Sequence, residues 1–103
     1  MARLTIIPTQ KEIHDLAVEK GFWKDSQNVG EKIALIHSEL SEGLEAYRTC
    51  KFRGEAGWIG EELADAVIRI MDLAEHLQVN LEEEIYNKHL TNKERPHKHG
   101  KDF

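Results

Sequence analysis

The amino-acid sequence predicts an all-α fold, arranged as one four-helix, bundle-like domain. Apolar residues recur every three or four positions in four stretches, and no stretch reads convincingly as a β-strand. Capping residues precede three of the four stretches. With 103 residues the chain is long enough for only one modest core, so we expect oligomerisation to complete the bundle.

The first helix is expected to begin after Thr9 and to end at Gly21. Thr9 and Glu12 have the spacing of a capping box, in which each side chain satisfies a free backbone N–H group. Apolar residues then recur at helical spacing, and Gly21 is a natural stop signal. A loop that carries Trp23 should follow.

The second and third helices are expected over residues 28–47 and 61–77, with a glycine-rich connector between them. Asn28 and Glu31 mark the start of the second helix by their capping spacing. Each helix carries one apolar stripe, which we expect to form the core. The stripes consist of Ile33, Ile36, Leu40 and Leu44 in the second helix and of Leu63, Val67, Ile70 and Leu77 in the third.

A fourth helix is expected to start at Asn80 and to end before Pro96, because Asn80 and Glu83 repeat the capping spacing. Its apolar face is weaker than those of the other helices. Residues 96–103 are rich in Lys and His. We expect them to form a flexible basic tail on the single domain that spans residues 1–103.

Charge and composition argue against several classes of protein. The net charge of −5 argues against a general nucleic-acid binder, which would carry a basic surface. No apolar run approaches the roughly 20 residues that a membrane helix needs. Cys50 is the only cysteine, which rules out an intramolecular disulfide and favours a reducing, cytoplasmic location.

Two acidic motifs lie on the expected second and third helices. Glu39 and Glu42 are three residues apart, as are Glu62 and Asp65, so each pair lies on one helix face. Consecutive helices usually pack as antiparallel neighbours, which would point four carboxylates into one gap. Such a cluster repels itself unless a hard cation binds it, and Mg²⁺ prefers oxygen ligands and phosphate.

Acidic residues are also common on solvated helix faces, and one such motif alone would carry little weight. The expected core positions Leu40 and Leu63 lie inside the two motifs, which predicts that the carboxylates lie at the edge of the packed seam. From the residues alone, a metal site and a solvated face are equally supported. Arg69 lies one turn beyond Asp65 and is expected to pair with Asp65 or Asp72.

The two motifs and their surroundings resemble the MazG-like, all-α nucleoside triphosphate pyrophosphohydrolases. That family carries E-x-x-E on one helix and E-x-x-D on the next, which here read ELSE and ELAD. The run EELADAVIRIMDLAEHLQVNLEEEI is similar to the family as well, and KHLTNKERP is similar to its K-x-x-x-N element followed by proline. The resemblance covers residues 14–96, and Ser38 stands where relatives often carry a further Glu.

The resemblance implies a magnesium-dependent enzyme, with Mn²⁺ as a substitute ion, that hydrolyses a (deoxy)nucleoside triphosphate to the monophosphate and pyrophosphate. It implies that the metal ligands are Glu39, Glu42, Glu62 and Asp65. Either Glu39 or Glu42 would also accept the proton of the attacking water. The family further suggests a house-cleaning role in the nucleotide pool, carried out by a homodimer or a dimer of dimers.

Other residues are candidates for contacts to the substrate. The candidates for phosphate or sugar are Lys88 and Asn92, which match the K-x-x-x-N element, together with Lys32 and Arg95. His14 and Trp23 lie at positions similar to those of a His and a Trp in pyrimidine-selective relatives. They are candidates for a base pocket, because Trp offers a flat apolar face on which a base stacks. A structural role, with Trp23 anchoring the loop, is equally supported.

Two alternatives stay open. Phosphoribosyl-ATP pyrophosphohydrolase, from the same fold group, would use the same metal chemistry on an adenylate derivative. A non-catalytic helical interaction module would carry the same acids as a solvated face. Stabilisation by metal separates the module from the enzymes, and substrate assays separate the two enzymes.

Overall fold

The computed structural model describes residues 5–102, apart from the side chain of His99; residues 1–4 and 103 of the expected domain and tail lie outside this part. The described chain contains four α-helices, α1 (Ile7–Glu19), α2 (Val29–Arg48), α3 (Ile59–His76) and α4 (Leu81–Glu94), and no strand. The all-α prediction is therefore confirmed. A short 3₁₀ turn, η1 (His97–Gly100), lies within the expected tail. None of the described helices is long and apolar enough to cross a membrane.

Side-chain caps set the starts of α2 and α4 as expected. The side chain of Asn28 accepts a hydrogen bond from the backbone N–H of Glu31 at 2.9 Å. The side chain of Asn80 accepts one from the backbone N–H of Glu83 at 3.0 Å. Because the first N–H groups of a helix have no partner within it, these two asparagines fix where the helices begin.

The start of α1 differs from the expectation. The helix begins at Ile7 instead of after Thr9, and no side chain at its N-cap position caps it. Pro8 fits the first turn because its missing N–H group needs no partner there. The carboxylate of Glu82, in the first turn of α4, accepts the N–H groups of Ile6 (2.6 Å) and Ile7 (3.3 Å). A residue far away in the sequence therefore replaces the predicted local cap.

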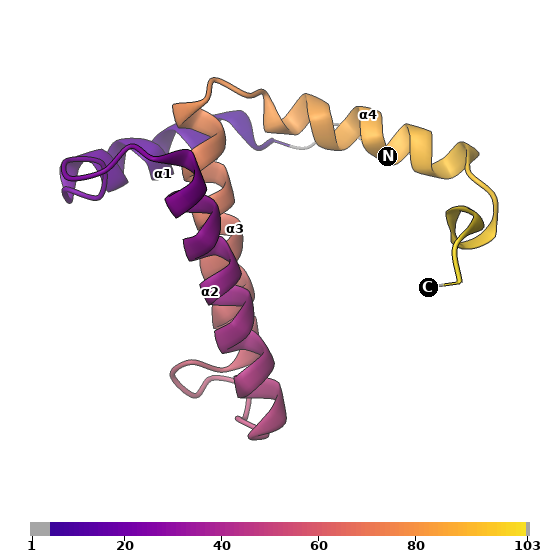
Figure 1. Ribbon diagram of the computed structural model, residues 1–103, viewed down its shortest axis with the longest axis horizontal. Helices are drawn as coiled ribbons and strands as arrows, with labels where there is room; N and C mark the ends of the chain where they lie inside the picture. The colour runs from indigo at the N-terminus through magenta and orange to yellow at the C-terminus, as the bar shows by residue number, and fades with distance from the viewer. Residues whose placement is uncertain (1–4, 103) are drawn as a thin grey trace.

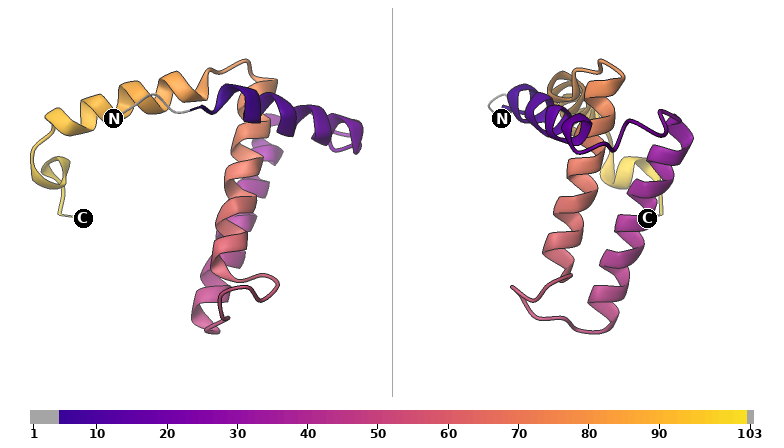
Figure 2. Two further views of the ribbon diagram at one scale, coloured as in Figure 1. Left: turned by 180° about the vertical axis from the view of Figure 1, so that it is seen from behind. Right: turned by 90° about the vertical axis from the view of Figure 1, so that its left-hand side faces the viewer.

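Helices α2 and α3 lie side by side as an antiparallel pair joined by the glycine-rich connector (Figure 1). Helix α1 packs across the C-terminal part of α3, and α4 leaves the same end of the pair in the other direction (Figures 1 and 2). Among the described residues, α4 packs along none of the other helices. The described residues of a single chain therefore do not form a closed four-helix bundle. The weak apolar face of α4 packs against no other helix among them.

The chain is open for its size. Its radius of gyration is 15.9 Å, whereas a compact domain of about 100 residues has a radius of gyration of about 13 Å. The buried apolar residues in the described chain are few, and half of them are alanines: Trp23, Ala46, Ala66, Met71, Leu73 and Ala74. Small residues in the seam between α2 and α3 let the two backbones approach closely, but they bury little apolar area.

The stripes predicted to form the core lie largely on the surface of the single chain. Leu40 is 48% exposed and Leu63 is 51% exposed. The prediction is wrong for one chain because the helices pack through another face, which carries the buried residues Glu39 and Glu62. We call the exposed residues the apolar stripes: Ile33, Leu40, Leu44 and Tyr47 on α2, and Leu63, Val67, Ile70 and Leu77 on α3.

Candidate metal centre

Three carboxylates meet in the seam between α2 and α3. Glu39, Glu42 and Glu62 each offer one oxygen atom, and these atoms all lie within 4.8 Å of one another. Glu39 and Glu62 are buried, at 9% and 8% exposure, whereas Glu42 is exposed. Glu39 and Glu62 therefore lie within the seam instead of at its predicted edge, whereas the exposed Glu42 lies at the edge as predicted. We call these three residues the acid cluster.

The position of Glu62 depends on a glycine in the opposite helix. Gly43 of α2 is buried, and a Cβ atom built on it would lie 3.5 Å from the Cβ atom of Glu62. The α2 backbone therefore approaches Glu62 with no side chain between them. The Oε2 atom of Glu62 is buried and, within the described chain, has no hydrogen-bond partner. A buried carboxylate oxygen without a donor needs a proton or a cation.

The members of the acid cluster differ in their affinity for protons. Burial, followed by the nearby carboxylates of Glu42 and Glu39, raises the pKa of Glu62 to about 7. The pKa of Glu39 is lowered instead, chiefly because the Arg69 side chain donates a hydrogen bond to it. Below about pH 7 the metal-free cluster therefore holds a proton on Glu62. A divalent cation would neutralise the same negative charge.

Arg69 pairs with Glu39, which corrects the expectation that it pairs with Asp65 or Asp72. Its Nε atom donates to Glu39 Oε1 at 2.8 Å, across the seam from α3 to α2. Asp72 lies one turn further along α3 and accepts hydrogen bonds from other residues. The narrow seam thus brings the guanidinium within reach of the opposite helix.

A groove adjoins the acid cluster. It has a volume of about 380 Å³ and lies between α1, the loop after it, α2 and α3. Asp65 lies outside the closely spaced cluster, one turn along α3 from Glu62, and lines this groove together with Glu39 and Arg69. The apolar lining consists of Ile13, Leu16, Ala17, Phe22 and Ile68. Apolar and charged side chains therefore line the same groove, with the carboxylates of Glu39 and Asp65 among them.

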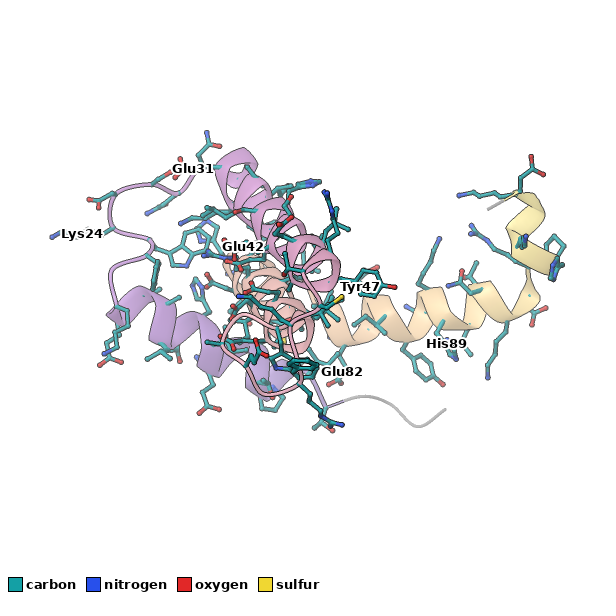
Figure 3. The ribbon with its side chains drawn as sticks, turned by 90° about the horizontal axis from the view of Figure 1, so that it is seen from below. Lys24, Glu31, Glu42, Tyr47, Glu82 and His89 are labelled. Atoms are coloured by element: carbon teal, nitrogen blue, oxygen red, sulfur yellow. The ribbon has the colours of Figure 1, made fainter. Side chains whose placement is uncertain are left out.

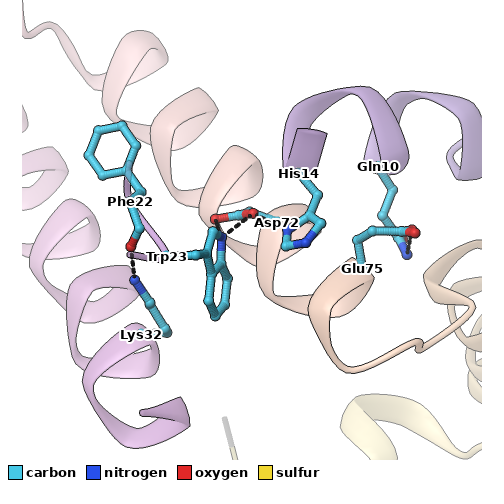
Figure 4. Close-up of polar contacts among 7 residues, drawn as sticks. All are labelled: Gln10, His14, Phe22, Trp23, Lys32, Asp72 and Glu75. Atoms are coloured by element: carbon cyan, nitrogen blue, oxygen red, sulfur yellow. Dashed lines mark hydrogen bonds and ion pairs between the residues drawn. The ribbon is translucent and has the colours of Figure 1, made fainter. Parts of the chain in front are cut away.

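His14 and Trp23 converge on Asp72 (Figure 4). The Nδ1 atom of His14 forms a hydrogen bond with Asp72 Oδ1 at 2.7 Å. The indole N–H group of Trp23 donates to both oxygens of the same carboxylate, at 2.9 and 3.1 Å. These contacts hold α1 and the loop after it against α3. The two residues were predicted for a base pocket, and that role stays a prediction.

Lys32 and His76 cover the ring of Trp23, which is only 6% exposed. The His76 ring stacks on it, with centroids 4.1 Å apart, and Lys32 Nζ lies 4.4 Å from the ring centroid. Lys32 Nζ also donates to the backbone carbonyl of Phe22 at 2.7 Å (Figure 4). The lysine predicted to bind phosphate therefore stabilises the loop in this chain.

The remaining predicted substrate contacts lie on α4, away from the acid cluster of the same chain. Lys88 and Asn92 belong to this helix, and Arg95 follows its last residue. Figure 3 shows His89 of α4 well separated from Glu42 in the α2–α3 pair. One chain thus brings Glu39, Glu42 and Glu62 together, as the motif spacing predicts, but not the K-x-x-x-N element.

Lys51 is a cation close to the acid cluster that the sequence did not reveal. A Cβ atom built on Gly57 would lie 3.0 Å from Lys51 Nζ and 3.5 Å from Glu62 Oε1. The ammonium group and the Glu62 carboxylate therefore both lie near Gly57 of the connector, without an ion pair between them in the described chain. Motif spacing gives no signal for this placement, because it depends on a turn in which Gly57 has a φ angle of 77°.

No family model, curated protein or solved structure matches this chain. Its function must therefore be inferred from the residues of the candidate site. The acid cluster, the adjoining groove and the two nearby cations, Arg69 and Lys51, are the features that bear on it.

Proposed function

We propose that the chain is a magnesium-dependent nucleoside triphosphate pyrophosphohydrolase that releases a nucleoside monophosphate and pyrophosphate. The observation that carries the proposal is the acid cluster: within residues 5–102 the buried Glu62 has an oxygen without a hydrogen-bond partner, and the carboxylates of Glu39 and Glu42 lie within 4.8 Å. Buried carboxylates this close together need a compensating positive charge. The resemblance of the two acidic motifs to the MazG-like enzymes supports the same activity.

The donor atoms suit Mg²⁺, with Mn²⁺ as a substitute. All three ligand atoms of the acid cluster are carboxylate oxygens, which are hard donors. Asp65 would add a fourth carboxylate from the groove side, one turn along α3 from Glu62. When bound, the ion would polarise phosphate oxygens and lower the pKa of a coordinated water.

The groove suits the nucleoside part of the substrate. Its volume of about 380 Å³ falls in the usual range for small-molecule sites. Phe22 is 61% exposed on its wall and offers an aromatic face for a base. Because Glu39 and Asp65 line the same groove, a nucleoside bound there would place its phosphates at the carboxylates.

The reaction breaks the bond between the α-phosphorus and the α–β bridging oxygen. A water oxygen bonds to the α-phosphorus, pyrophosphate leaves with the electron pair, and the proton of the water passes to a carboxylate. Glu42 suits this last role better than Glu39. Glu39 is bound to Arg69 and its pKa is lowered, whereas Glu42 is exposed within the same cluster.

The exposed apolar stripes support a homodimer or a dimer of dimers. Covering them with a second copy would remove apolar area from water and complete the modest core. Lys88, Asn92 and Arg95 would then reach the acid cluster of a neighbouring copy, because α4 points away from its own. A cytoplasmic house-cleaning role in the nucleotide pool is part of the same proposal.

The direct test incubates the purified protein with standard and modified nucleoside triphosphates, with MgCl₂ or with a chelator, and resolves the products. We expect a monophosphate and pyrophosphate, formed only with the metal. Formation of orthophosphate and a diphosphate would reject the proposed bond. Phosphoribosyl-ATP in the substrate panel tests the alternative enzyme. If neither Mg²⁺ nor nucleotide stabilises the chain, the result favours the non-catalytic interaction module.

A further inference from the structure

The charges at the acid cluster are not balanced for a polyphosphate substrate. One divalent ion and the guanidinium of Arg69 would neutralise three carboxylates, which leaves no positive charge for the incoming phosphates. The cations predicted from the motifs lie elsewhere in the chain: Lys32 is bound to the loop, and Lys88 is on α4. The cations that a single copy of the chain itself has near the acid cluster are Arg69 and Lys51.

Arg69 lies where the groove meets the acid cluster. It lines the groove, its side chain is 35% exposed, and its Nε atom donates to Glu39. A guanidinium carries five N–H donors in a fixed fork, so the contact through Nε leaves its terminal amino groups for an anion. A phosphate attached to a nucleoside in the groove would lie next to them.

Lys51 approaches the acid cluster from the connector, on the side of Glu62. The same backbone position, Gly57, lies close to both Lys51 Nζ and Glu62 Oε1. Within residues 5–102 the ammonium group makes one hydrogen bond, a 3.3 Å contact with the carbonyl of Ala56 at the surface. Because this single hydrogen bond is long and lies at the surface, the exposed side chain of Lys51 can turn toward a phosphate.

The two cations lie at opposite ends of the acidic part of α3. The connector with Lys51 precedes Glu62, and Arg69 follows Glu62 by seven residues, a span of about 10 Å in a helix. The groove begins at the Arg69 end and the connector lies at the other. A substrate with its nucleoside in the groove would therefore extend its phosphate chain toward Lys51.

Resting on the proposed function, we propose that Arg69 and Lys51 bind the two ends of the phosphate chain. Arg69 contacts the phosphate that stays on the nucleoside, and Lys51 contacts the departing pyrophosphate. Hydrolysis between them leaves the monophosphate on Arg69 and the pyrophosphate on Lys51. Both are substrate-binding residues, and they fix the direction in which a triphosphate lies in the site.

The products allow each end to be tested separately. Isothermal titration calorimetry in MgCl₂ measures the binding of inorganic pyrophosphate and of a set of nucleoside monophosphates. For Lys51→Met we expect pyrophosphate affinity to fall by about tenfold and monophosphate affinity to stay unchanged. For Arg69→Lys we expect the reverse. Lys11→Met removes an exposed cation of α1, paired with Asp15 at 3.7 Å, and should change neither.

Loss of the fold is controlled by the choice of variants. Arg69→Lys keeps a positive charge beside the buried Glu39, and its melting temperature checks that the chain is folded. If it melts much lower than the wild type, Arg69→Gln replaces it, because the amide still donates to a carboxylate. Either variant must lose monophosphate affinity while it keeps that for pyrophosphate.

The outcomes separate this inference from the proposed function. Suppose that the wild type hydrolyses triphosphates, but both variants lose affinity for the same product, or Lys51→Met loses affinity for the monophosphate and the Arg69 variant for pyrophosphate. The proposed direction of the substrate is then wrong, and the proposed activity stands. If the wild type hydrolyses none, the proposed function fails, and the calorimetry still decides. A selective loss of pyrophosphate affinity in Lys51→Met then supports the phosphate site with two ends. If the wild type does not bind pyrophosphate at all, this inference is overturned.

Discussion

Gly43 of α2 lies directly against Glu62 of α3, so that a Cβ atom on the glycine would be 3.5 Å from the Cβ atom of the acid. This is an ordinary contact distance, and one methyl group fits. We therefore expect Gly43→Ala to raise the free energy of unfolding by about 0.5–1 kcal/mol, because alanine is the better helix former. Urea denaturation measures the change.

A larger side chain at Gly43 should have the opposite effect. Gly43→Leu must push α2 away from Glu62, which lowers the free energy of unfolding and separates the carboxylates. Stabilisation by Mg²⁺ should then be lost in Gly43→Leu and kept in Gly43→Ala. Equal Mg²⁺ stabilisation in the two variants would contradict the close approach of the helices.

The stability of the metal-free protein should fall as the pH rises toward and past about 7. The pKa of Glu62 is raised from its ordinary 4.5 to about 7 in the folded chain, so the folded state binds the proton more tightly. This contribution is complete below pH 4.5 and is lost through about pH 7. Glu39 acts in the opposite sense: its pKa is lowered, so its contribution exists above 4.5 and is lost on acidification.

Because Mg²⁺ and the proton compete for the same carboxylate, the rise in melting temperature on adding Mg²⁺ should be larger at about pH 8 than at about pH 5.5. Differential scanning fluorimetry over this range measures both effects. Glu62→Gln should remove the downward slope of stability with pH and most of the Mg²⁺ effect. A Mg²⁺ effect of the same size at both pH values would show that the ion binds elsewhere.

Glu42→Gln and Asp65→Asn each remove the charge of one proposed ligand without changing its size. We expect each substitution to lower kcat/KM by about 100-fold or more. Even the mutation of a residue that only hydrogen-bonds to a metal ligand typically lowers metal affinity or activity by roughly 10–100-fold. The metal-free melting temperature should hold or rise in Glu42→Gln, since repulsion within the cluster decreases. Glu45→Gln, one exposed turn beyond Glu42, is the matched control. Full activity in either ligand variant would reject the site.

Asp72→Asn should loosen the loop after α1. The carboxylate accepts hydrogen bonds from Trp23 and contacts His14, and an amide retains one oxygen acceptor for them. We expect a loss of about 1–3 kcal/mol in the free energy of unfolding and a change in the near-ultraviolet circular dichroism of Trp23. Asp15→Asn, on the exposed face of α1, should change neither quantity.

The apolar stripes predict that the wild type assembles in solution. Size-exclusion chromatography with light scattering should give the mass of a dimer or a tetramer. Leu44→Lys together with Val67→Lys should give a monomer with a lower melting temperature, because both residues are more than half exposed in the single chain and would be buried by a partner. A monomeric wild type would contradict this prediction.

Local signals predicted the helices well, and the contacts between helices poorly. Asn28 and Asn80 cap their helices as the spacing predicts, since a cap needs only neighbouring residues. The predicted start of α1 was wrong because Glu82, from another helix, accepts the backbone N–H groups at its first turn. Hydrophobic spacing identified the helix faces that favour burial, but it does not show which surface packs against each face. Leu40 was therefore assigned to the core of the single chain, where it is in fact exposed.

The acid cluster was found because its spacing is local to two helices. The pairing of Arg69 with Glu39 was missed, since it depends on how α3 rotates against α2. Lys51 was missed because the fold of the connector, with Gly57 in a left-handed conformation, decides where the ammonium group lies. Side chains that reach the site from another element are therefore visible only in the folded chain.

The enclosure of Trp23 has a practical consequence, because the chain contains only one other tryptophan, Trp58. The Trp23 ring is stacked on His76 and its N–H group donates to Asp72, whereas the Trp58 ring covers Gly60 at the start of α3. The two indoles therefore lie at different places: Trp23 against the C-terminal half of α3, and Trp58 at its N-terminal start. Intrinsic fluorescence of single-tryptophan variants should therefore separate changes near Asp72 from changes at the start of α3, in real time and without a chemical label.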